Sequence, residues 1–524
     1  MPKGQARASL SPMKIRPGGS GLGRRLAANT LHAASGRFVA LVLWVVLAPV
    51  ILRALGPEGF AVWSLFFTLT GWLAALDLGL AQGTLRHIAG ARARGDNEAA
   101  GGFATVGAIG FVLLGVLWLA LTPPLAAHIV VFLRVPQQLK GDAVFAIQAG
   151  AAVFALSGLA NITIAVAQGY DRFALGNGIS VVASLAQAVG IVWALRSGSG
   201  LRGLIVASGA GWLIASVAGM TALRTRVRQF HWGGVAAVRS RVREALAFGG
   251  PMQAASVFSA AHQQLDKLLL ARFVSLASVT PYELGLRIAT STSTFPQLLL
   301  LAAMPAASAI HAAEPARLEE LYARGNRYVL SASAVAISAL LGAADPLLAA
   351  WLGGPQPEAA LALRGLAITG AVALATGMGT AITRAVGRTS YEAEFAAVAL
   401  GLHALLGLLL VPRFGLAGAL TAILAGNIAG GAWFLSRLAN VIGSSRAQVL
   451  LEPLGWPLVA TVLGAGAGLG LNHALQAPAS GVAAWGVAVA CFGVAALVAA
   501  AILSITRYLP LAEALALLPR QSKT

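Results

Sequence analysis

Charged side chains inside long apolar stretches are the residues of this 524-residue chain that could do chemistry. The candidates are Arg37, Asp77, Asp266, Lys267, Glu283 and Arg287. A charge at the centre of a bilayer costs about 2.5–3.5 kcal/mol on insertion scales, so such a residue usually faces a water-filled cavity or a partner. In a cavity, cations can bind phosphate groups, whereas carboxylates can gate access or bind a coupling ion.

The basic candidates suit an anionic ligand. Arg37 lies in "HAASGRFVALVLW", where a guanidinium could hold phosphate or pyrophosphate through two parallel hydrogen bonds. The alternative is that Arg37 snorkels to the cytoplasmic interface, because it lies about one-third of the way into its apolar segment. Lys267 and Arg287 are the other predicted substrate-binding residues.

Asp77 interrupts a second apolar segment, "WLAALDLGLAQGT". We expect it to pair with Arg37 on the neighbouring helix and to gate the inner mouth of the cavity, because an unpaired carboxylate there is costly. The alternative is a hydrogen bond between helices. Asp77 is therefore predicted to have a gating or ion-coupling role.

Two further acids lie in the second half of the chain. Asp266 is adjacent to Lys267, so their side chains point about 100° apart on a helix, and one of them can face the cavity while the other pairs with a helix. Glu283 precedes Arg287 by four residues, the favourable order for an intrahelical ion pair. Both acids are predicted gating or ion-coupling residues, although Glu283 and Arg287 could simply neutralise each other near the outer interface. His262 is predicted to be a packed, hydrogen-bonded histidine rather than a proton relay.

The composition predicts an integral membrane protein. Hydrophobic residues make up 58% of the chain and charged residues 10%, against about 25% charged in soluble proteins. The net charge of +19 then reflects basic cytoplasmic loops rather than nucleic-acid binding. A single cysteine excludes an intrachain disulfide, and the sequence has no P-loop, so an ATP-driven pump is unsupported. No cofactor and no metal site is predicted.

Apolar segments of about 20 residues predict fourteen transmembrane helices. These lie at 26–53, 59–88, 101–122, 142–168, 174–196, 200–223, 244–273, 281–310, 326–351, 359–385, 391–411, 415–441, 450–473 and 481–506. When the connecting segments are assigned alternately to the two sides, 26 of the 37 Lys and Arg residues fall on the side of the N-terminus and 8 on the other. This asymmetry predicts a multi-pass membrane protein with both termini in the cytoplasm.

The chain nearly repeats itself at an offset of 215–222 residues. "SGLRGLIVASGAG" (199–211) aligns with "FGLAGALTAILAG" (414–426), and "AQGYDRFALGN" (167–177) aligns with "AVGRTSYEAEF" (385–395). Six spans in each half predict two lobes related by a pseudo-two-fold axis along the membrane normal. The predicted divisions are a disordered basic cytoplasmic tail (1–25), an N-lobe (26–223), a basic cytoplasmic linker (224–243), a C-lobe (244–441), and an extra helix pair with a cytoplasmic tail (442–524).

Three motifs carry a family resemblance. "LGPEGFAVWSLFFTLTGWLAALDLGLAQGTLRHIAGARARGD", "QLDKLLLARF" followed by "YELGLRI", and "VPRFGLAGA" resemble the Wzx-type polysaccharide flippases of the MOP superfamily, over about residues 25–440. The resemblance implies an all-α MOP/MATE-like fold. It also implies alternating-access, ion-coupled transport of an undecaprenyl-pyrophosphate-linked oligosaccharide from the cytoplasmic to the periplasmic leaflet of the bacterial inner membrane. The implied partners are this substrate, membrane lipids and polymerase or ligase proteins of the same pathway, with no nucleic acid.

Three other functions stay open. A MATE-like cation or drug antiporter predicts an acid-dominated cavity, whereas Arg37 and Lys267 favour an anionic cargo. A membrane polymerase or ligase of the same pathway would need a large outer loop, but the predicted outer loops are short, and the sequence carries no hydrolase motif. A non-transporting scaffold is the third alternative. The sequence therefore favours a transporter that is not an enzyme.

Overall fold

The computed structural model describes residues 19–75, 79–300, 303–476 and 480–509. Within these ranges the chain forms α-helices joined by short turns and 3-10 helices, and it forms no strand. The helices are α1 (Gly19–Ala75), α2 (Leu80–Ala93), α3 (Asn97–Phe132), α4 (Lys140–Gly169), α5 (Phe173–Arg196), α6 (Gly200–Arg226), α7 (Val235–Phe273), α8 (Val279–Leu299), α9 (Ala303–Ala313), α10 (Leu318–Leu352), α11 (Pro357–Ala375), α12 (Gly377–Ala385), α13 (Ser390–Ile442), α14 (Arg446–Leu450), α15 (Gly455–Leu475) and α16 (Val482–Ile505). The prediction of an all-α membrane protein is confirmed.

Ten helices among the described residues are long and apolar enough to cross a membrane. Two of the ten cover more than one predicted span: α1 contains the first span and the beginning of the second, and α13 contains two whole spans. In each, a glycine with non-helical angles breaks the helix between the spans. These are Gly56 (φ 68°, ψ 175°) and Gly415 (φ 54°, ψ −128°). The polar helices α7 and α8 are not among the ten but occupy two further predicted spans. The count of fourteen stays a prediction.

Three predicted spans are interrupted along their length in the structure, although one of them, 359–385, still corresponds to one of the ten segments of spanning length (Pro357–Ala385). The segment 59–88 divides between the end of α1 and α2, which begins after Gly79 in a left-handed conformation (φ 69°). The segment 281–310 divides into α8 and α9, and 359–385 into α11 and α12. Hydropathy alone does not register a backbone break inside an apolar stretch, since the apolar pattern continues across it.

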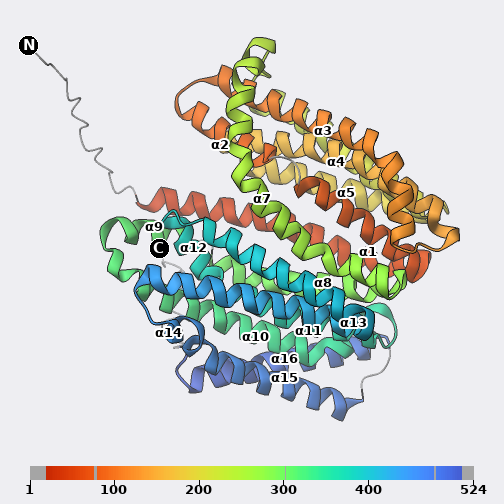
Figure 1. Ribbon diagram of the computed structural model, residues 1–524, viewed down its shortest axis with the longest axis vertical. Helices are drawn as coiled ribbons and strands as arrows, with labels where there is room; N and C mark the ends of the chain where they lie inside the picture. The colour runs from red at the N-terminus through yellow and green to blue at the C-terminus, as the bar shows by residue number, and fades with distance from the viewer. Residues whose placement is uncertain (1–18, 76–78, 301–302, 477–479, 510–524) are drawn as a thin grey trace, which may run out of the picture.

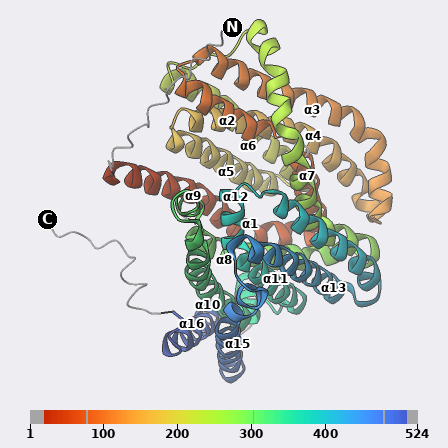
Figure 2. The same cartoon turned by 60° about the vertical axis from the view of Figure 1, so that its left-hand side comes forward.

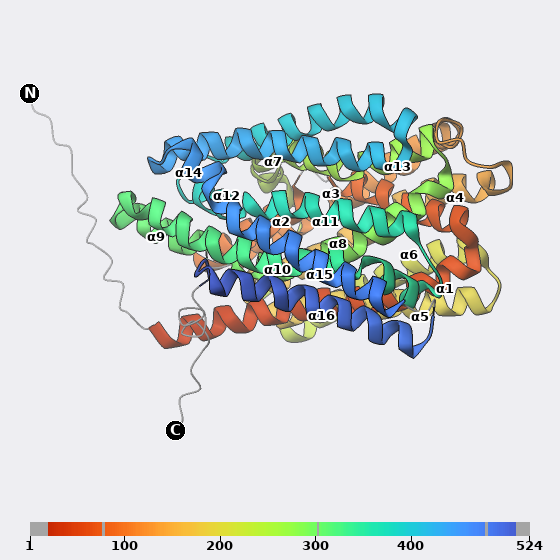
Figure 3. The same cartoon turned by 90° about the horizontal axis from the view of Figure 1, so that it is seen from below.

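The helices form two groups (Figure 1). In the first, α1 packs on α5, α3 on α4, and both α4 and α5 on α6. In the second, α8 packs on α11, α13 packs on α7 and α11, and α15 and α16 cover α10. Figure 2 shows α15 and α16 at the far side of the second group, away from the first. Seen from below, the long helices run roughly along one common direction (Figure 3), as expected for a bundle that crosses a membrane.

Small residues allow α15 and α16 to approach α10 closely. A Cβ placed on Gly468 of α15 would lie 2.9 Å from the Cα of Gly342 on α10 and 3.0 Å from the Cβ of Ala495 on α16. In lipid, where hydrophobic burial does not drive helix association, such close van der Waals packing is a main source of stability. The sequence pattern of glycine and alanine thus fixes the extra pair onto the second group.

Helix α7 joins the two groups. Its beginning packs against α3, where a Cβ on Gly102 would lie 3.2 Å from the carbonyl oxygen of Ala237. Its end packs against α13 and leads through the 3-10 helix η2 (Leu276–Ser278) into α8. Residues 235–243, predicted as part of a linker, therefore belong to a helix. The same helix carries Asp266 and Lys267.

Candidate functional site

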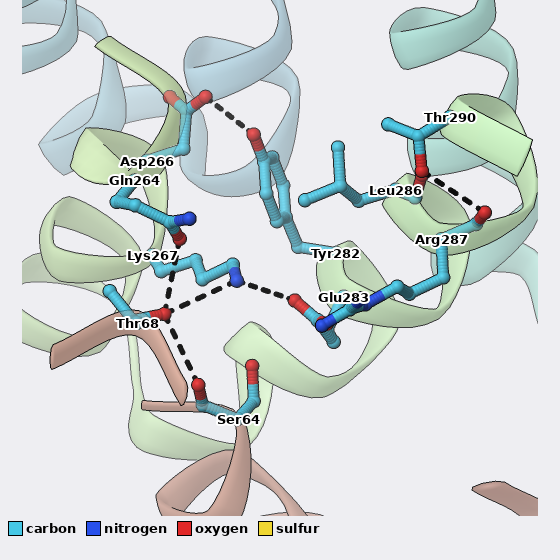
Figure 4. A network of polar contacts seen from close by, with 10 residues as sticks. All are labelled: Ser64, Thr68, Gln264, Asp266, Lys267, Tyr282, Glu283, Leu286, Arg287 and Thr290. Atoms are coloured by element: carbon cyan, nitrogen blue, oxygen red, sulfur yellow. Dashed lines mark hydrogen bonds and ion pairs between the residues drawn. The ribbon is translucent and has the colours of Figure 1, made fainter. Parts of the chain in front are cut away.

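A buried ion-pair cluster lies where α7, α8 and α1 meet (Figure 4). The Nζ of Lys267 on α7 lies 2.6 Å from Oε2 of Glu283 on α8, and Nε of Arg287 lies 2.7 Å from Oε1 of the same carboxylate. The side chains of Lys267 and Glu283 are only 4% and 3% exposed. One buried carboxylate thus faces two cations, and these three side chains carry a net charge of +1.

The short connection between α7 and α8 creates this arrangement. Because only residues 274–278 separate the two helices, the last turns of α7 lie beside the first turns of α8. Two neighbouring residues of α7 therefore contact two neighbouring residues of α8. Asp266 accepts a hydrogen bond of 2.7 Å from the Tyr282 hydroxyl, and Lys267 pairs with Glu283. Contrary to the expectation that one of them would face a cavity, Asp266 and Lys267 are both buried and both contact α8. They diverge only in their other contacts, since Asp266 also contacts α13 whereas Lys267 contacts α1.

Thr68 links the cluster to the first group of helices. Lys267 Nζ donates to the Thr68 hydroxyl over 3.2 Å, and that hydroxyl lies 3.1 Å from Oε1 of Gln264 and 3.2 Å from the carbonyl oxygen of Ser64. Thr68 is 1% exposed, so the link is shielded from solvent. Figure 4 shows these contacts meeting at the Thr68 hydroxyl, with Lys267 reaching from there to Glu283. Lys267 is therefore a structural bridge between the two groups of helices as well as a member of the cluster.

Arg287 is the exposed cation of the cluster. Its side chain is 44% exposed, and its guanidinium lies 5.5 Å from the ring centroid of Trp44 on α1, a cation–π geometry. Among the described residues its two terminal nitrogens make no hydrogen bond, because Glu283 engages Nε alone. These terminal nitrogens can bind one more anion in a bidentate manner.

A polar stripe follows Arg287 along α8. Thr290 and Thr294 are exposed and Ser291 is partly exposed. Their hydroxyls donate to backbone carbonyl oxygens four residues earlier, over 2.8, 3.4 and 2.6 Å respectively. Since the protons are used within the helix, the oxygen lone pairs remain as acceptors for a ligand. The sequence analysis missed this stripe, although its signal, hydroxyl residues three, four and seven positions after Arg287, is visible in "RIATSTST".

Asp266 belongs to a second polar cluster with α13. His403 Nε2 lies 2.8 Å from Asp266 Oδ1, and the Nδ1 atoms of His403 and His262 lie 3.1 Å apart. His262 Nε2 lies 2.9 Å from the amide nitrogen of Asn427. His403 and Asn427 were not among the predicted site residues. Each is a polar residue isolated in an apolar span, "GLHALLG" and "LAGNIAGG", and that isolation was the available signal.

The remaining predicted residues lie outside the described part of the site. Asp77 lies outside the described residues, as does the side chain of Arg37, although Arg37 is part of the helix α1. Their predicted pairing across the first two spans stays a prediction. The structure thus brings together four of the six predicted residues, Asp266, Lys267, Glu283 and Arg287, at the end of α7 and the start of α8.

Comparisons with known proteins come from a family model and from solved structures. The family model described as "Polysaccharide biosynthesis protein" matches residues 26–311. No curated protein sequence matches the chain.

Three solved structures are similar in fold. The lipid II flippase MurJ in an inward closed conformation has a TM-score of 0.68 at 12% identity, over 92% of this chain and 98% of that one. An inward-facing multidrug resistance MATE transporter of the MOP superfamily has a TM-score of 0.62 at 17% identity, over 80% and 96%. A MOP superfamily transporter from Pyrococcus furiosus has a TM-score of 0.55 at 17% identity, over 80% and 95%. At these identities the likeness concerns the fold, and the predicted MOP/MATE-like fold class is confirmed.

Proposed function

Because this chain belongs to the polysaccharide biosynthesis protein family, we propose that it is a flippase for a lipid-linked oligosaccharide. The cargo would be an undecaprenyl-pyrophosphate-linked repeat unit of O-antigen, capsule or exopolysaccharide, moved from the cytoplasmic to the periplasmic leaflet. The mechanism would be ion-coupled alternating access. No bond is made or broken in this process, so the protein would not be an enzyme.

The observation that carries this proposal is the exposed face of α8. Arg287 offers free guanidinium nitrogens, and Thr290 and Thr294 offer hydroxyl oxygens on the same face. A membrane helix presents such groups to water or to a polar ligand, because their exposure to hydrocarbon is costly. A pyrophosphate could bind at Arg287 while sugar hydroxyls donate to the stripe. An aqueous cavity between the two groups of helices follows from this proposal.

The charge of the cluster favours an anionic cargo over a cationic one. Lys267 and Arg287 together outnumber Glu283 by one charge, and Arg37, on the first span, would add a further cation. A cation antiporter would need the opposite balance in its cavity. Lys267 is nearly fully buried in this conformation, so we assign it to the substrate site only in conformations that release Glu283. Asp77, Asp266 and Glu283 keep their proposed gating or ion-coupling roles.

Backbone breaks at equivalent positions support the two proposed lobes, and the asymmetry of Lys and Arg residues supports the proposed orientation. Asp171 and Gly387 both have positive φ, as do Gly200 and Gly415, and these pairs agree with the predicted repeat offset of 215–222 residues. With both termini in the cytoplasm of the inner membrane, the break at Gly56 lies at the outer surface. Hydrogen bonds between α1 and the second group at that end would then close the outer side. Membrane lipids and pathway polymerases or ligases are the proposed partners.

Substitution of Arg287 tests the proposal directly. The probe is a fluorescent polyprenyl-pyrophosphate oligosaccharide in proteoliposomes, and a membrane-impermeant lectin measures its appearance on the other leaflet. We expect Arg287→Ala to slow transport about 10- to 100-fold, because a hydrogen bond to a charged group contributes about 1.5–3 kcal/mol. Arg287→Lys should retain part of the activity.

The matched control is Arg413→Ala, which removes an exposed arginine elsewhere on the second group of helices. It should transport at the original rate. Full transport by Arg287→Ala would contradict the assigned site. If the unaltered protein leaves the probe in place but exports a cationic dye, the antiporter alternative replaces the flippase. Elongation of the probe would instead identify an enzyme.

A further inference from the structure

A chain of four hydrogen bonds includes a partly exposed histidine and a fully buried carboxylate. His262 on α7 is partly exposed, whereas His403 on α13 and Asp266 on α7 are 0% exposed. The contacts run from Asn427 to His262 (2.9 Å), from His262 to His403 (3.1 Å), and from His403 to Asp266 (2.8 Å), and Tyr282 adds one of 2.7 Å. Every one of these contacts except that of Tyr282 therefore joins α7 to α13.

One protonation pattern satisfies all of these contacts. The Asn427 side-chain nitrogen also lies 2.9 Å from the carbonyl oxygen of Ile423. A carbonyl oxygen can only accept, so the atom of Asn427 that faces both Ile423 and His262 must be the NH₂ group, a donor. His262 Nε2 then accepts from Asn427, which places the His262 proton on Nδ1. That proton is donated to Nδ1 of His403, so His403 carries its own proton on Nε2 and donates it to Asp266. In this pattern each histidine carries one proton, and both oxygens of Asp266 accept hydrogen bonds.

We propose that this cluster is a proton-binding site whose occupancy changes the packing of α7 against α13. A proton taken up from water at Nε2 of the partly exposed His262 would let the Nδ1 proton of His262 pass to Nδ1 of His403, forming an imidazolium beside the Asp266 carboxylate. His262 Nδ1 then accepts rather than donates, and the added proton stays on Nε2. There it meets the Asn427 amide donors at 2.9 Å. Two donors then face each other, and the contact between His262 and Asn427 breaks.

The donor set favours a proton over a metal cation. Na⁺, Ca²⁺ and Mg²⁺ require several oxygen ligands. Here both oxygens of Asp266 already accept hydrogen bonds, the two histidines offer nitrogen atoms, and Asn427 presents its amide nitrogen. In the part of the chain that the structure describes, no set of three or more histidine, cysteine or acidic residues has the arrangement of a metal site.

The other titratable groups near the cluster link it to the cargo site. Helix α8 contributes Tyr282, which donates to Asp266, and Glu283, which follows Tyr282 in the sequence. Helix α7 contributes Lys267, which follows Asp266 in the sequence and pairs with Glu283. Arg287 lies beyond Glu283, and α1 contributes the uncharged Thr68. A change in the position of Asp266 therefore reaches the Lys267–Glu283 pair through one peptide bond in each helix. This proposal rests on the proposed function for its physiological meaning.

The test uses the full chain in lipid nanodiscs without cargo, with the proton itself as the ligand. Spin labels are placed at Arg172→Cys, in the turn before α5, and at Thr389→Cys, in the turn before α13, in a Cys491→Ala background. Pulsed electron paramagnetic resonance measures the distance between the labels from about pH 5 to about pH 8.5, the range in which histidines commonly titrate. We expect the distance distribution to shift with pH.

The variants make the assignment specific. Asp266→Asn and His403→Gln should each abolish the pH-dependent shift, whereas His128→Gln, on the exposed histidine of α3, should preserve it. Asn427→Asp should raise the pH at the midpoint of the distance change by about one unit, because a carboxylate accepts from protonated His262 and attracts its charge. A merely structural role for Asn427 would not move the midpoint in this direction.

Two outcomes would overturn the proposal. One is a pH-dependent shift that is unchanged in both Asp266→Asn and His403→Gln. The other is a distance that responds to added Na⁺ at constant pH and not to pH. Transport of the lipid-linked probe is measured separately. Transport without a pH-dependent change in the label distance would contradict the proton site but not the flippase assignment. A pH-dependent change in the distance without transport would contradict the flippase assignment but not the proton site.

Discussion

At the residue scale, Glu283 holds the ion-pair cluster together. Its side chain is 3% exposed, and its two oxygens lie 2.6 Å from Lys267 and 2.7 Å from Arg287. Removal of one partner from a buried pair is strongly destabilising, because the other charge stays buried without compensation. Without Glu283, Lys267 would be a buried charge with no counter-charge, since its remaining contact is the neutral Thr68 hydroxyl. Arg287 reaches solvent and would not.

We therefore expect Glu283→Gln to lower the free energy of unfolding by about 3–5 kcal/mol. Replacement of both members of the pair, in Lys267→Met with Glu283→Gln, should recover most of that loss, since no buried charge remains unpaired. Unfolding in detergent, followed by circular dichroism, gives both values. The control Glu314→Gln alters a carboxylate that is 65% exposed and should change stability little. A double variant as unstable as the single one would contradict this account.

At the scale of single helices, glycine decides where apolar stretches turn. Gly415 divides α13 into two arms at φ 54° and ψ −128°, a conformation open almost only to glycine. The nearest side-chain atom to a Cβ there would be Val274 Cγ2 at 3.8 Å, so space is available. His403 lies on the first arm and Asn427 on the second, and the turn brings both against His262.

Gly415→Ala should consequently lower the free energy of unfolding by about 1–3 kcal/mol, because alanine is strained in this backbone conformation and not because its Cβ overlaps another atom. It should also weaken the pH response of the His262–His403 cluster, because the two arms of α13 lose their register. Gly466→Ala, in the middle of α15 with no atom within 4 Å of the new Cβ, should be neutral or slightly stabilising. Thermal unfolding of both variants measures the difference. Equal stability of the two would show that α13 tolerates another turn geometry.

At the scale of the whole molecule, the two groups of helices meet near the Gly56 break. The Thr280 hydroxyl donates to the carbonyl oxygen of Pro57 over 2.6 Å, and Trp351 Nε1 donates to the carbonyl oxygen of Val45 over 2.7 Å. Arg53 adds a contact of 3.5 Å to the carbonyl oxygen of Leu352. These bonds link residues about 200–300 positions apart in the chain, so they close one end of the interface between the groups.

Trp351→Phe keeps the ring beside Trp44 and removes the hydrogen bond to Val45. A net loss of about 1 kcal/mol would shift the population about fivefold towards opening of this end. Spin labels at Glu58→Cys and Glu358→Cys, with Cys491→Ala, report that opening as a longer distance. Trp433→Phe is the control, because Trp433 bonds to Glu394 within α13 and away from the interface. An unchanged distance in Trp351→Phe would show that this bond does not hold the end closed.

The sequence by itself determined the class of the molecule and most of its helices. Low charge and apolar runs of spanning length require a membrane bundle, since such stretches lie stably only in lipid or against one another. Family membership and four of the assembled site residues were also readable, because charges in apolar spans are costly and therefore conspicuous. The i, i+4 spacing of Glu283 and Arg287 predicted their ion pair, which is observed at 2.7 Å.

Only the tertiary structure decided which side chains meet across helices. His403 and Asn427 approach His262 through a fold of α13 at Gly415, and Lys267 reaches Thr68 from 199 residues away. No local pattern encodes such contacts, because they depend on how two helix faces are rotated towards each other. The same reason separates the exposed Arg287 from the buried Lys267. Both are cations in apolar spans, and the packing of α1 and α8 alone makes one a bridge and the other an open binding group.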